Sequence, residues 1–324
     1  LYYAGSIVAP GGTVSFNLAP SLLLETYRPD QGLWFLAGSS VNVDGRTVLA
    51  TRQDGRRVGT VLDGGNIAID AARGFVVMQS GALWSANGAR DELQVQRDDG
   101  LFELFEVASR GGNIQISTTD GLLLGGALSA RGGATTAAGG SFSLLVDNRR
   151  NNDPNGVLPV GPRRILVGGA SSAVGSGDAW LPASTLTSGG FDFVSLVARD
   201  TLRPQNLIGP DVLATGTIVL ADGVAMAPRA RLVLGASTLQ VEGSARLASA
   251  YVALGSNDFL SQQPGVAASG TGVLEVESRL TEFFGQFALF GVSQTRVTGV
   301  DGVRFSGVFG PAGGDYRANV RFPG

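Results

Sequence analysis

Apolar residues alternate with small or polar ones over short stretches that recur along the whole chain. The phrase Gly64-Gly65-Asn66-Ile67-Ala68-Ile69 returns as Gly111-Gly112-Asn113-Ile114-Gln115-Ile116, and looser copies begin at Gly11, Gly139 and Gly189. A glycine pair followed by alternating apolar and small residues predicts a turn that leads into a short strand. A unit of this size cannot bury its apolar face alone, so we expect the copies to stack on one another.

Strand signals of this kind recur almost everywhere, mostly as runs of three to five residues bounded by Gly, Asp or Asn. The predicted strands are 41–43, 67–69, 75–78, 114–116, 122–124, 142–146, 191–197, 217–220, 231–234, 238–241, 273–276 and 296–297. Strands this short and numerous, separated by turns instead of crossover helices, predict an all-β protein built as a parallel β-helix. Ile67, Ile69, Ile114 and Ile116 should then point inward, with Ala68 and Gln115 facing out.

We expect residues 1–324 to form one elongated body, because repeat arrays grow without adding separate cores. A coil of about 20–24 residues would suit such a body. The glycine-pair copies are 47 residues apart (111 minus 64) and the next step is 28 (139 minus 111), so the connecting loops must vary. Glycine tolerates positive φ, which makes the glycine pairs and Asp44-Gly45 natural corners.

Three segments lack the repeated pattern of short apolar strands and glycine turns, and we expect them to protrude from the body. Residues 90–109 are rich in charge and alternate around Asp98-Asp99-Gly100, which predicts a β-hairpin. Residues 148–164 predict a long polar loop, and 255–269 form a third candidate. Such excursions either carry specificity or are loops that the scaffold tolerates.

The amino-acid composition excludes the catalytic mechanisms that depend on His, Cys or Lys. The chain has no Cys and no His, and all 24 basic residues are Arg. A Ser-His triad, a thiol nucleophile, a zinc site of the usual ligands, a Schiff base and a P-loop lysine are therefore excluded. The net charge of -3 without a basic stripe disfavours nucleic acid as a partner. No apolar run approaches the roughly 20 residues of a membrane span.

Carboxylates are the remaining catalytic candidates. They cluster at Asp91, Glu92, Asp98, Asp99, Glu103 and Glu106. They could form a glycosidase pair or bind calcium, but a hairpin tip bearing Asp and Gly is more often a solvated turn. We therefore assign no catalytic, cofactor-binding or metal-binding residue.

Two further groups have a structural and a functional interpretation. Residues 126–133 are glycine-rich, but they lack the Gly-Lys-Ser/Thr ending of a P-loop and are read as a corner. The second group is aromatic and comprises Trp34, Phe35, Trp84, Trp180, Phe283, Phe284, Phe287 and Phe290. We expect these side chains to stack in the core or cover its end, and an exposed row would instead indicate a carbohydrate platform.

The glycine-pair phrase followed by Gly74-Phe75-Val76-Val77 and by residues 81–88 resembles the coil of the filamentous haemagglutinin family. The pattern returns at 111–116 with 125–132, and the likeness covers most of the chain. This resemblance implies a right-handed β-helix from a large exoprotein of a Gram-negative bacterium. Such proteins pass through a dedicated outer-membrane transporter partner and serve adhesion, haem-related uptake or toxin delivery. The family's amino-terminal secretion domain is not evident, although 153–156 weakly echo its phrases.

The leading hypothesis is a non-catalytic structural and binding role in a two-partner secretion adhesin, secreted or held at the bacterial cell surface. The chain lacks a leader and is expected to be an internal segment of a longer protein. Its expected partners are the outer-membrane transporter during secretion and a host or bacterial surface receptor or glycan. Two alternatives are a β-helical polysaccharide lyase or glycosidase, and an extracellular filament subunit that associates end to end with its own copies.

Overall fold

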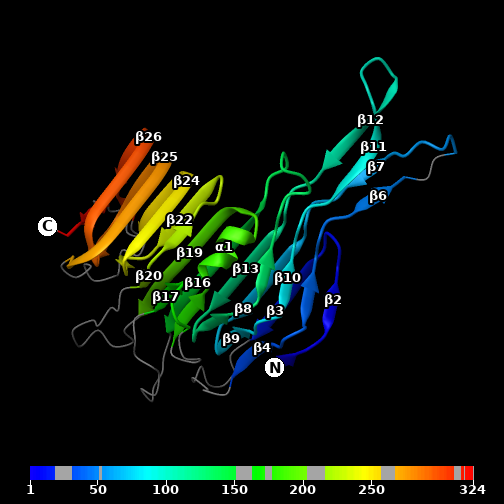
Figure 1. Ribbon diagram of the computed structural model, residues 1–324. Helices are drawn as coiled ribbons and strands as arrows, with labels where there is room; N and C mark the ends of the chain where they lie inside the picture. The colour runs from blue at the N-terminus through cyan, green and yellow to red at the C-terminus, as the bar shows by residue number, and fades with distance from the viewer. Residues whose placement is uncertain are drawn as a thin grey trace.

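The computed structural model describes residues 1–18, 31–50, 53–150, 163–171, 177–202, 216–256, 267–309, 315–316 and 318–323. Within them the chain is almost entirely β-strand, and the one helix is α1 (Ala183–Ser188). Most strands pair in parallel, and the two chain ends lie at opposite ends of an elongated body (Figure 1). The prediction of an all-β protein is confirmed.

The first of three parallel ladders carries the glycine-pair phrases. It joins β3 (Thr13–Leu18), β8 (Asn66–Ala71), β13 (Asn113–Thr118), β16 (Gly140–Arg150), β19 (Phe191–Leu202), β22 (Arg231–Gly235), β24 (Ser244–Ser256), β25 (Ser269–Phe290) and β26 (Val292–Ser306). Asn66 pairs with Thr13 on one side and with Asn113 on the other, and Asn113 pairs with Ser141. The sequence repeat is therefore also a repeat in space.

The second ladder runs beside the first, and the third is shorter. The second joins β1 (Tyr2–Tyr3), β4 (Gly32–Phe35), β9 (Phe75–Met78), β14 (Leu122–Leu124), β18 (Asp178–Leu181), β17 (Arg164–Val167), β20 (Thr217–Leu220), β23 (Thr238–Val241), β25 and β29 (Asn319–Arg321). The third joins β2 (Ser6–Val8), β5 (Ser40–Asn42), β10 (Leu83–Ser85) and β15 (Ala127–Ser129). The helix α1 contacts β15 and β21 (Val224–Met226), and β21 pairs with the first part of β24.

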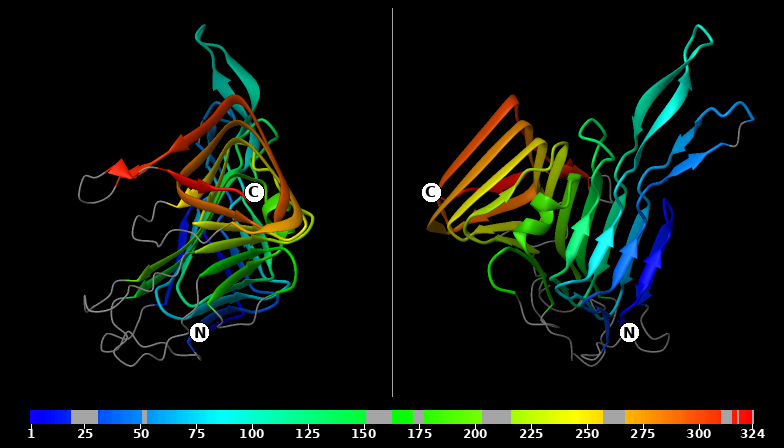
Figure 2. Two further views of the ribbon diagram at one scale, coloured as in Figure 1. Left: turned by 90° about the vertical axis from the view of Figure 1, so that its left-hand side faces the viewer. Right: turned by 45° about the vertical axis from the view of Figure 1, so that its right-hand side comes forward.

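The core lies between the three ladders. One buried cluster contains Ile67 of the first ladder, Val76 of the second and Trp84 of the third. Figure 2 shows the strands arranged around this interior. Ile67, Ile69, Ile114 and Ile116 are at most 2% exposed, whereas Gln115 faces solvent, as the alternation predicts. Burying each such side chain contributes about 1.5–3 kcal/mol to folding.

Strand positions agree with the prediction best where apolar alternation is strong. The strands predicted at 75–78, 122–124, 217–220 and 238–241 match β9, β14, β20 and β23 residue for residue. The predicted strand length is wrong near the C-terminus, where β24, β25 and β26 have 13, 22 and 15 residues. Ser, Ala, Arg and Glu interrupt the apolar signal there. Pairing on both sides keeps β24 and β25 extended, and pairing with β25 keeps β26 extended.

The helix α1 was not predicted. Its sequence Ala-Ser-Thr-Leu-Thr-Ser spans six residues, begins after Pro182 and has no side-chain cap. A segment this short shows no 3.6-residue periodicity, so only its position against β15 and β21 selects the helix.

The expected coil of 20–24 residues is wrong for most steps along the first ladder. Paired residues lie 53 positions apart from Thr13 to Asn66 (66 minus 13), but 20 apart from Arg231 to Tyr251 (251 minus 231). Nine described strands consequently form this ladder, fewer than a uniform short coil would give. Excursions consume the remaining residues, because a loop can grow without disturbing the register.

The repeated glycine pairs are explained by close packing of the backbone. Gly64, Gly65, Gly111 and Gly112 are absent from the glycines with positive φ, which corrects the expectation of left-handed corners. A Cβ on Gly65 would lie 2.0 Å from the carbonyl oxygen of Gly12, and one on Gly112 would lie 1.9 Å from that of Gly65. Successive copies therefore approach each other too closely for any side chain.

The interior also holds a charged cluster. Asp120 is 1% exposed and accepts hydrogen bonds from Arg73 Nη1 at 3.1 Å and from the Gly74 amide at 2.6 Å. Arg163, equally buried, places Nη2 3.8 Å from the same carboxylate. This cluster links the segment before β14 to the segments before β9 and β17. Removing one of its partners would leave a buried charge without compensation.

Candidate binding surface

Two antiparallel hairpins leave the body side by side (Figures 1 and 2). The hairpin predicted at 90–109 is confirmed as β11 (Arg90–Gln96) and β12 (Phe102–Ala108), paired from Arg90 with Ala108 to Gln96 with Phe102. Its turn is closed by a 2.8 Å hydrogen bond from the Arg97 amide to the Leu101 carbonyl, and Gly100 has φ of 84°. The turn that connects β11 and β12 therefore lies at the predicted Asp-Gly sequence.

The second hairpin was not predicted. It consists of β6 (Thr47–Leu49) and β7 (Gly59–Val61), which pair from Thr47 with Val61 to Leu49 with Gly59. Asp54-Gly55, with Gly55 at φ of 71°, was the available sequence signal. Arginines and small residues on both sides of this turn hide the apolar alternation that marks a strand.

Arg57 joins the two hairpins into one unit, which we call the hairpin pair (residues 47–61 and 90–108). Its guanidinium donates to both carboxylate oxygens of Asp91 at 2.6 and 2.7 Å, and its backbone exchanges hydrogen bonds with Gln94. Hydrogen bonds from Arg57 and then Thr47 hold the pKa of Asp91 below its usual range. Arg56 lies 4.3 Å from the ring centre of Phe102.

Charge complementarity supports this association. Residues 90–108 carry two Arg and six acidic residues, a net charge of -4, and residues 47–61 carry three Arg and one Asp, a net charge of +2. The acidic hairpin alone thus exceeds the net charge of -3 of the whole chain. The two hairpins attract each other, and β12, the strand farther from β7, retains negative charge.

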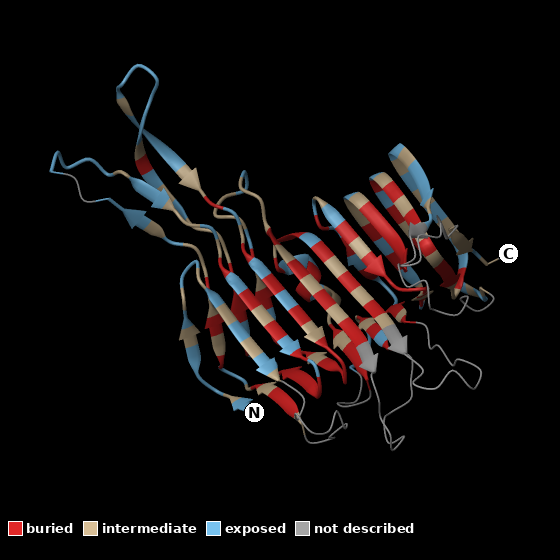
Figure 3. Cartoon of the chain, turned by 180° about the vertical axis from the view of Figure 1, so that it is seen from behind, coloured by how far each residue is buried: buried red, intermediate tan, exposed pale blue. Residues whose placement is uncertain are grey.

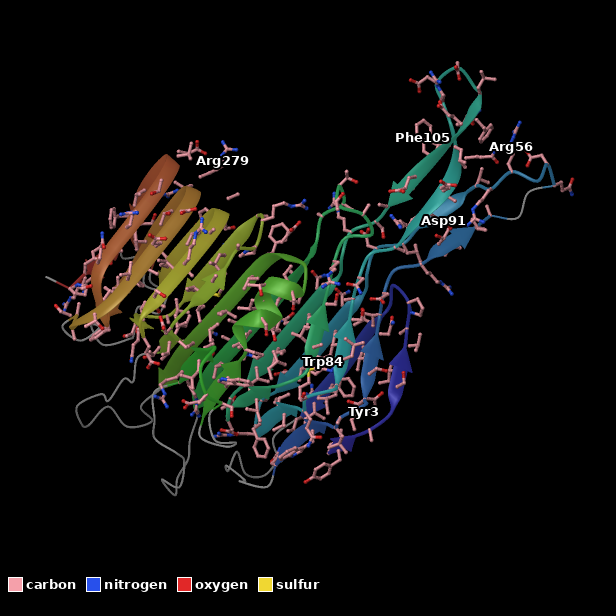
Figure 4. All side chains as sticks on the ribbon, viewed as in Figure 1. Tyr3, Arg56, Trp84, Asp91, Phe105 and Arg279 are labelled. Carbon is pink, nitrogen blue, oxygen red and sulfur yellow. The ribbon has the colours of Figure 1, made fainter. Side chains whose placement is uncertain are left out.

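The hairpin pair is largely exposed (Figure 3), yet it carries many apolar side chains. Six of the 15 large apolar side chains that are strongly exposed in the described part of the chain lie on it: Val48, Leu49, Val95, Leu101, Leu104 and Phe105. Of the described residues of the hairpin pair, Leu93 alone is buried, at 3% exposure. Arg56, Asp91 and Phe105 stand away from the body that buries Trp84 (Figure 4). Exposed apolar area rimmed by charge is typical of an interaction surface.

The strand β12 offers a free edge. The bonds from Arg97 to Leu101 and from Ser109 to Ala89 set the antiparallel alternation, so the amides and carbonyls of Leu104 and Glu106 point away from β11. Among the described strands, β12 pairs with β11 alone. An edge of this kind can accept an extended segment of another chain.

The acidic residues proposed as catalytic candidates do not converge. Asp91 is engaged by Arg57, Glu103 lies 2.9 Å from Arg97 Nη1, and Asp99 accepts the Leu101 amide at 3.0 Å. Across the described residues, no group of three or more Asp or Glu side chains could hold a metal ion. The arrangement thus gives Asp91, Asp99 and Glu103 a local structural partner each.

The core interpretation holds for four of the eight predicted aromatic residues, whereas Trp34, Trp180, Phe284 and Phe290 are half-buried. Phe35, Trp84, Phe283 and Phe287 are at most 2% exposed. Among the described residues, the exposed phenylalanines are others, at 105, 193, 305 and 322. The corner predicted at 126–133 is partly wrong, because 127–129 form the strand β15, while a Cβ on Gly133 would lie 1.9 Å from a backbone oxygen of Ala89.

The loop predicted at 148–164 is partly wrong. Residues 148–150 continue β16, paired with 200–202 of β19, and Arg164 begins β17. Both ends of the segment are thus held in ladders, and 151–162 lie outside the described residues. The candidate at 255–269 likewise has ends in β24 and β25, and its middle, 257–266, lies outside the described residues.

No protein-family model, curated protein or solved structure matches this chain. The described residues contain no helix long and apolar enough to cross a membrane.

Proposed function

We propose that this chain is a right-handed parallel β-helix that serves as a shaft and binding segment of a large secreted, adhesin-like exoprotein of a Gram-negative bacterium. In this proposal the three ladders are its faces, the hairpin pair recognises a surface receptor or glycan, and an outer-membrane transporter exports the whole protein. The chain performs no catalysis.

The observation that carries the proposal is that the regular body buries its apolar side chains, whereas the protruding hairpin pair exposes them. Parallel ladders in register run through the described length of the body and bury its apolar residues. The hairpin pair keeps six large apolar side chains exposed instead. Stability does not require that exposure, whereas a partner surface would cover it.

Surface binding by the purified chain tests the recognition role. The fluorescently labelled chain is applied to fixed epithelial cells and to intact Gram-negative bacteria. Leu101→Ser combined with Leu104→Ser should reduce bound protein about tenfold or more, because a few apolar anchors dominate an interface. Leu83→Ser combined with Val300→Ser is the matched control, since these side chains are 42% and 80% exposed on the body.

Equal binding of both double variants, with unchanged circular dichroism, would remove recognition from the hairpin pair. Cleavage of pectin, alginate or glycosaminoglycans by the wild-type chain would overturn the non-catalytic role. An experimental structure in which the ladders fail to wind right-handed around one core would overturn the β-helix.

A further inference from the structure

A shallow groove lies on the outer face of the first ladder, on the body of the protein. Its outward-facing residues come from β16, β19 and β22, and its volume is about 220 Å³. The residues that form it are Ser141, Ser143, Phe193, Ser195, Arg231 and Val233, above the buried Phe142 and Val194. We call it the Phe193 groove.

Parallel register explains why these side chains meet. Ser141 pairs with Phe193 and Phe193 with Arg231, so the three form one row across the strands. Ser143, Ser195 and Val233 form the next outward row. Neighbouring strands lie about 4.8 Å apart, and outward residues of one strand about 6.6 Å apart. The two rows therefore surround an area that suits a single six-membered sugar ring.

Phe193 supplies an apolar platform in this groove. Its side chain is 45% exposed, although Val194 beside it is buried at 2%. An aromatic ring on a flat sheet offers its face to the apolar C–H face of a pyranose. The hydroxyls of Ser143 and Ser195 lie in the adjacent row and have no hydrogen-bond partner among the described residues.

Arg231 supplies the charge. It forms no ion pair with a described residue, whereas Arg199 and Arg229 lie 2.7 and 2.5 Å from the carboxylates of Asp147 and Asp192. Its guanidinium carbon lies 5.4 Å from the ring centre of Tyr251. Tyr251 pairs with Arg231 on one side of β22, and Phe193 pairs with it on the other. Arg231 donates no hydrogen bond to another described residue, so its donors are left for an external acceptor.

The nearby Glu282 interacts electrostatically with Arg231 but is already engaged by other groups. The hydroxyls of Tyr251 and Ser306 both donate to it, and Arg304 Nε lies 3.7 Å away. The negative charge of Glu282 weakens the attraction of Arg231 for an anion but leaves the hydrogen-bond donors of Arg231 in place. The site consequently suits one negative charge better than a dense polyanion, as the net charge of -3 also indicates.

We propose that the Phe193 groove binds an anionic sugar residue of a glycan. The apolar face of the ring stacks on Phe193, its carboxylate or sulfate accepts a forked pair of hydrogen bonds from Arg231, and ring hydroxyls bond to Ser143 and Ser195. The groove is smaller than the roughly 300–1,000 Å³ of pockets for drug-sized ligands, so one residue of the glycan carries the recognition. This site is separate from the hairpin pair and does not depend on its role.

Saturation-transfer NMR with the intact chain tests the proposal, using galacturonate as the carboxylate probe, galactose 6-sulfate as the sulfate probe and cellotriose as the neutral one. At least one anionic probe should bind tenfold or more tighter than cellotriose, and the tighter one identifies the acidic group. Arg231→Gln and Phe193→Ala should each weaken that binding about tenfold, the size of one lost charge-assisted hydrogen bond or stacking contact.

The controls use the same residue types elsewhere on the body. Arg296→Gln and Phe305→Ala on β26 replace an exposed arginine and an exposed phenylalanine outside the groove and should leave binding unchanged. Three results would overturn the proposal: no binding of either anionic probe, equal binding of cellotriose, or binding that Arg231→Gln and Phe193→Ala leave intact.

Discussion

Replacing Gly112 by alanine tests the explanation of the repeated glycine pairs. The backbone of Gly112 does not have positive φ, so alanine is compatible with its conformation. The new methyl group, however, would lie 1.9 Å from the carbonyl oxygen of Gly65, on the neighbouring strand segment. Ordinary van der Waals contact begins at 3.4 Å, which requires a local displacement of 1.5 Å (3.4 minus 1.9).

That displacement acts on two backbone hydrogen bonds, of which the second joins two copies of the repeat. The Gly112 amide donates to the Ala86 carbonyl at 2.6 Å, and the Asn113 amide donates to the Gly65 carbonyl at 2.9 Å. Losing both costs about 1–3 kcal/mol, and overpacking adds about 1–3 kcal/mol. We therefore expect Gly112→Ala to lower the free energy of unfolding by about 2–6 kcal/mol.

Equilibrium urea unfolding followed by circular dichroism measures this change. Gly5→Ala is the matched control, because Gly5 also lacks positive φ and its nearest contact to an added Cβ is 3.7 Å. It should alter stability by less than about 0.5 kcal/mol. Hydrogen exchange should localise the loss to 64–69 and 111–116, since unfolding in a repeat array begins where neighbouring units separate.

The result also distinguishes close approach from backbone conformation. A site that needs positive φ tolerates asparagine better than alanine, whereas a site limited by space does not. Gly112→Asn should therefore be at least as destabilising as Gly112→Ala. An unchanged or increased stability of Gly112→Ala, as expected if only the entropy of the unfolded chain mattered, would refute the reasoning.

Asp120→Ala should lower the free energy of unfolding by about 3–5 kcal/mol, because two buried guanidinium groups lose their carboxylate, and urea unfolding against the exposed control Asp99→Ala checks this. Trp84→Ala should cost about 3–5 kcal/mol through the cavity it leaves, whereas Leu83→Ala on the outer side of the same strand should cost far less; thermal unfolding compares the two. Burial and then the hydrogen bond to a carboxylate raise the pKa of Tyr251 from 10.0 to about 12. The stability from this contact is complete below pH 10 and is lost as pH rises through about 12. An absorbance titration at the tyrosinate band should therefore show a phase near pH 12 in the wild-type chain, and Tyr251→Phe should remove it. A wild-type titration without this phase would contradict the assignment.

Local sequence was most informative where a short signal and its structural cause coincide. The alternation at 67–69 and 114–116 identified strands, their inward residues and the in-register stacking of the two copies. Asp98-Asp99-Gly100 identified the hairpin at 90–109, because a turn of this kind is encoded by the residues within it. Neither signal reported the partner of the hairpin, since the contact of Arg57 with Asp91 spans 34 residues.

The sequence by itself determined that this chain is a stack of β-strands, which residues of the repeated phrase face inward, and which catalytic chemistries are excluded. These properties depend on residue type and on spacing within a few positions. The tertiary structure decided the reason for the glycine pairs, the length of the late strands, the place of α1, the union of the hairpins and the meeting of Phe193 with Arg231. Each of these depends on which strand lies beside which. Paired positions of the first ladder are an irregular 20 to 53 residues apart, so no local pattern reveals that adjacency.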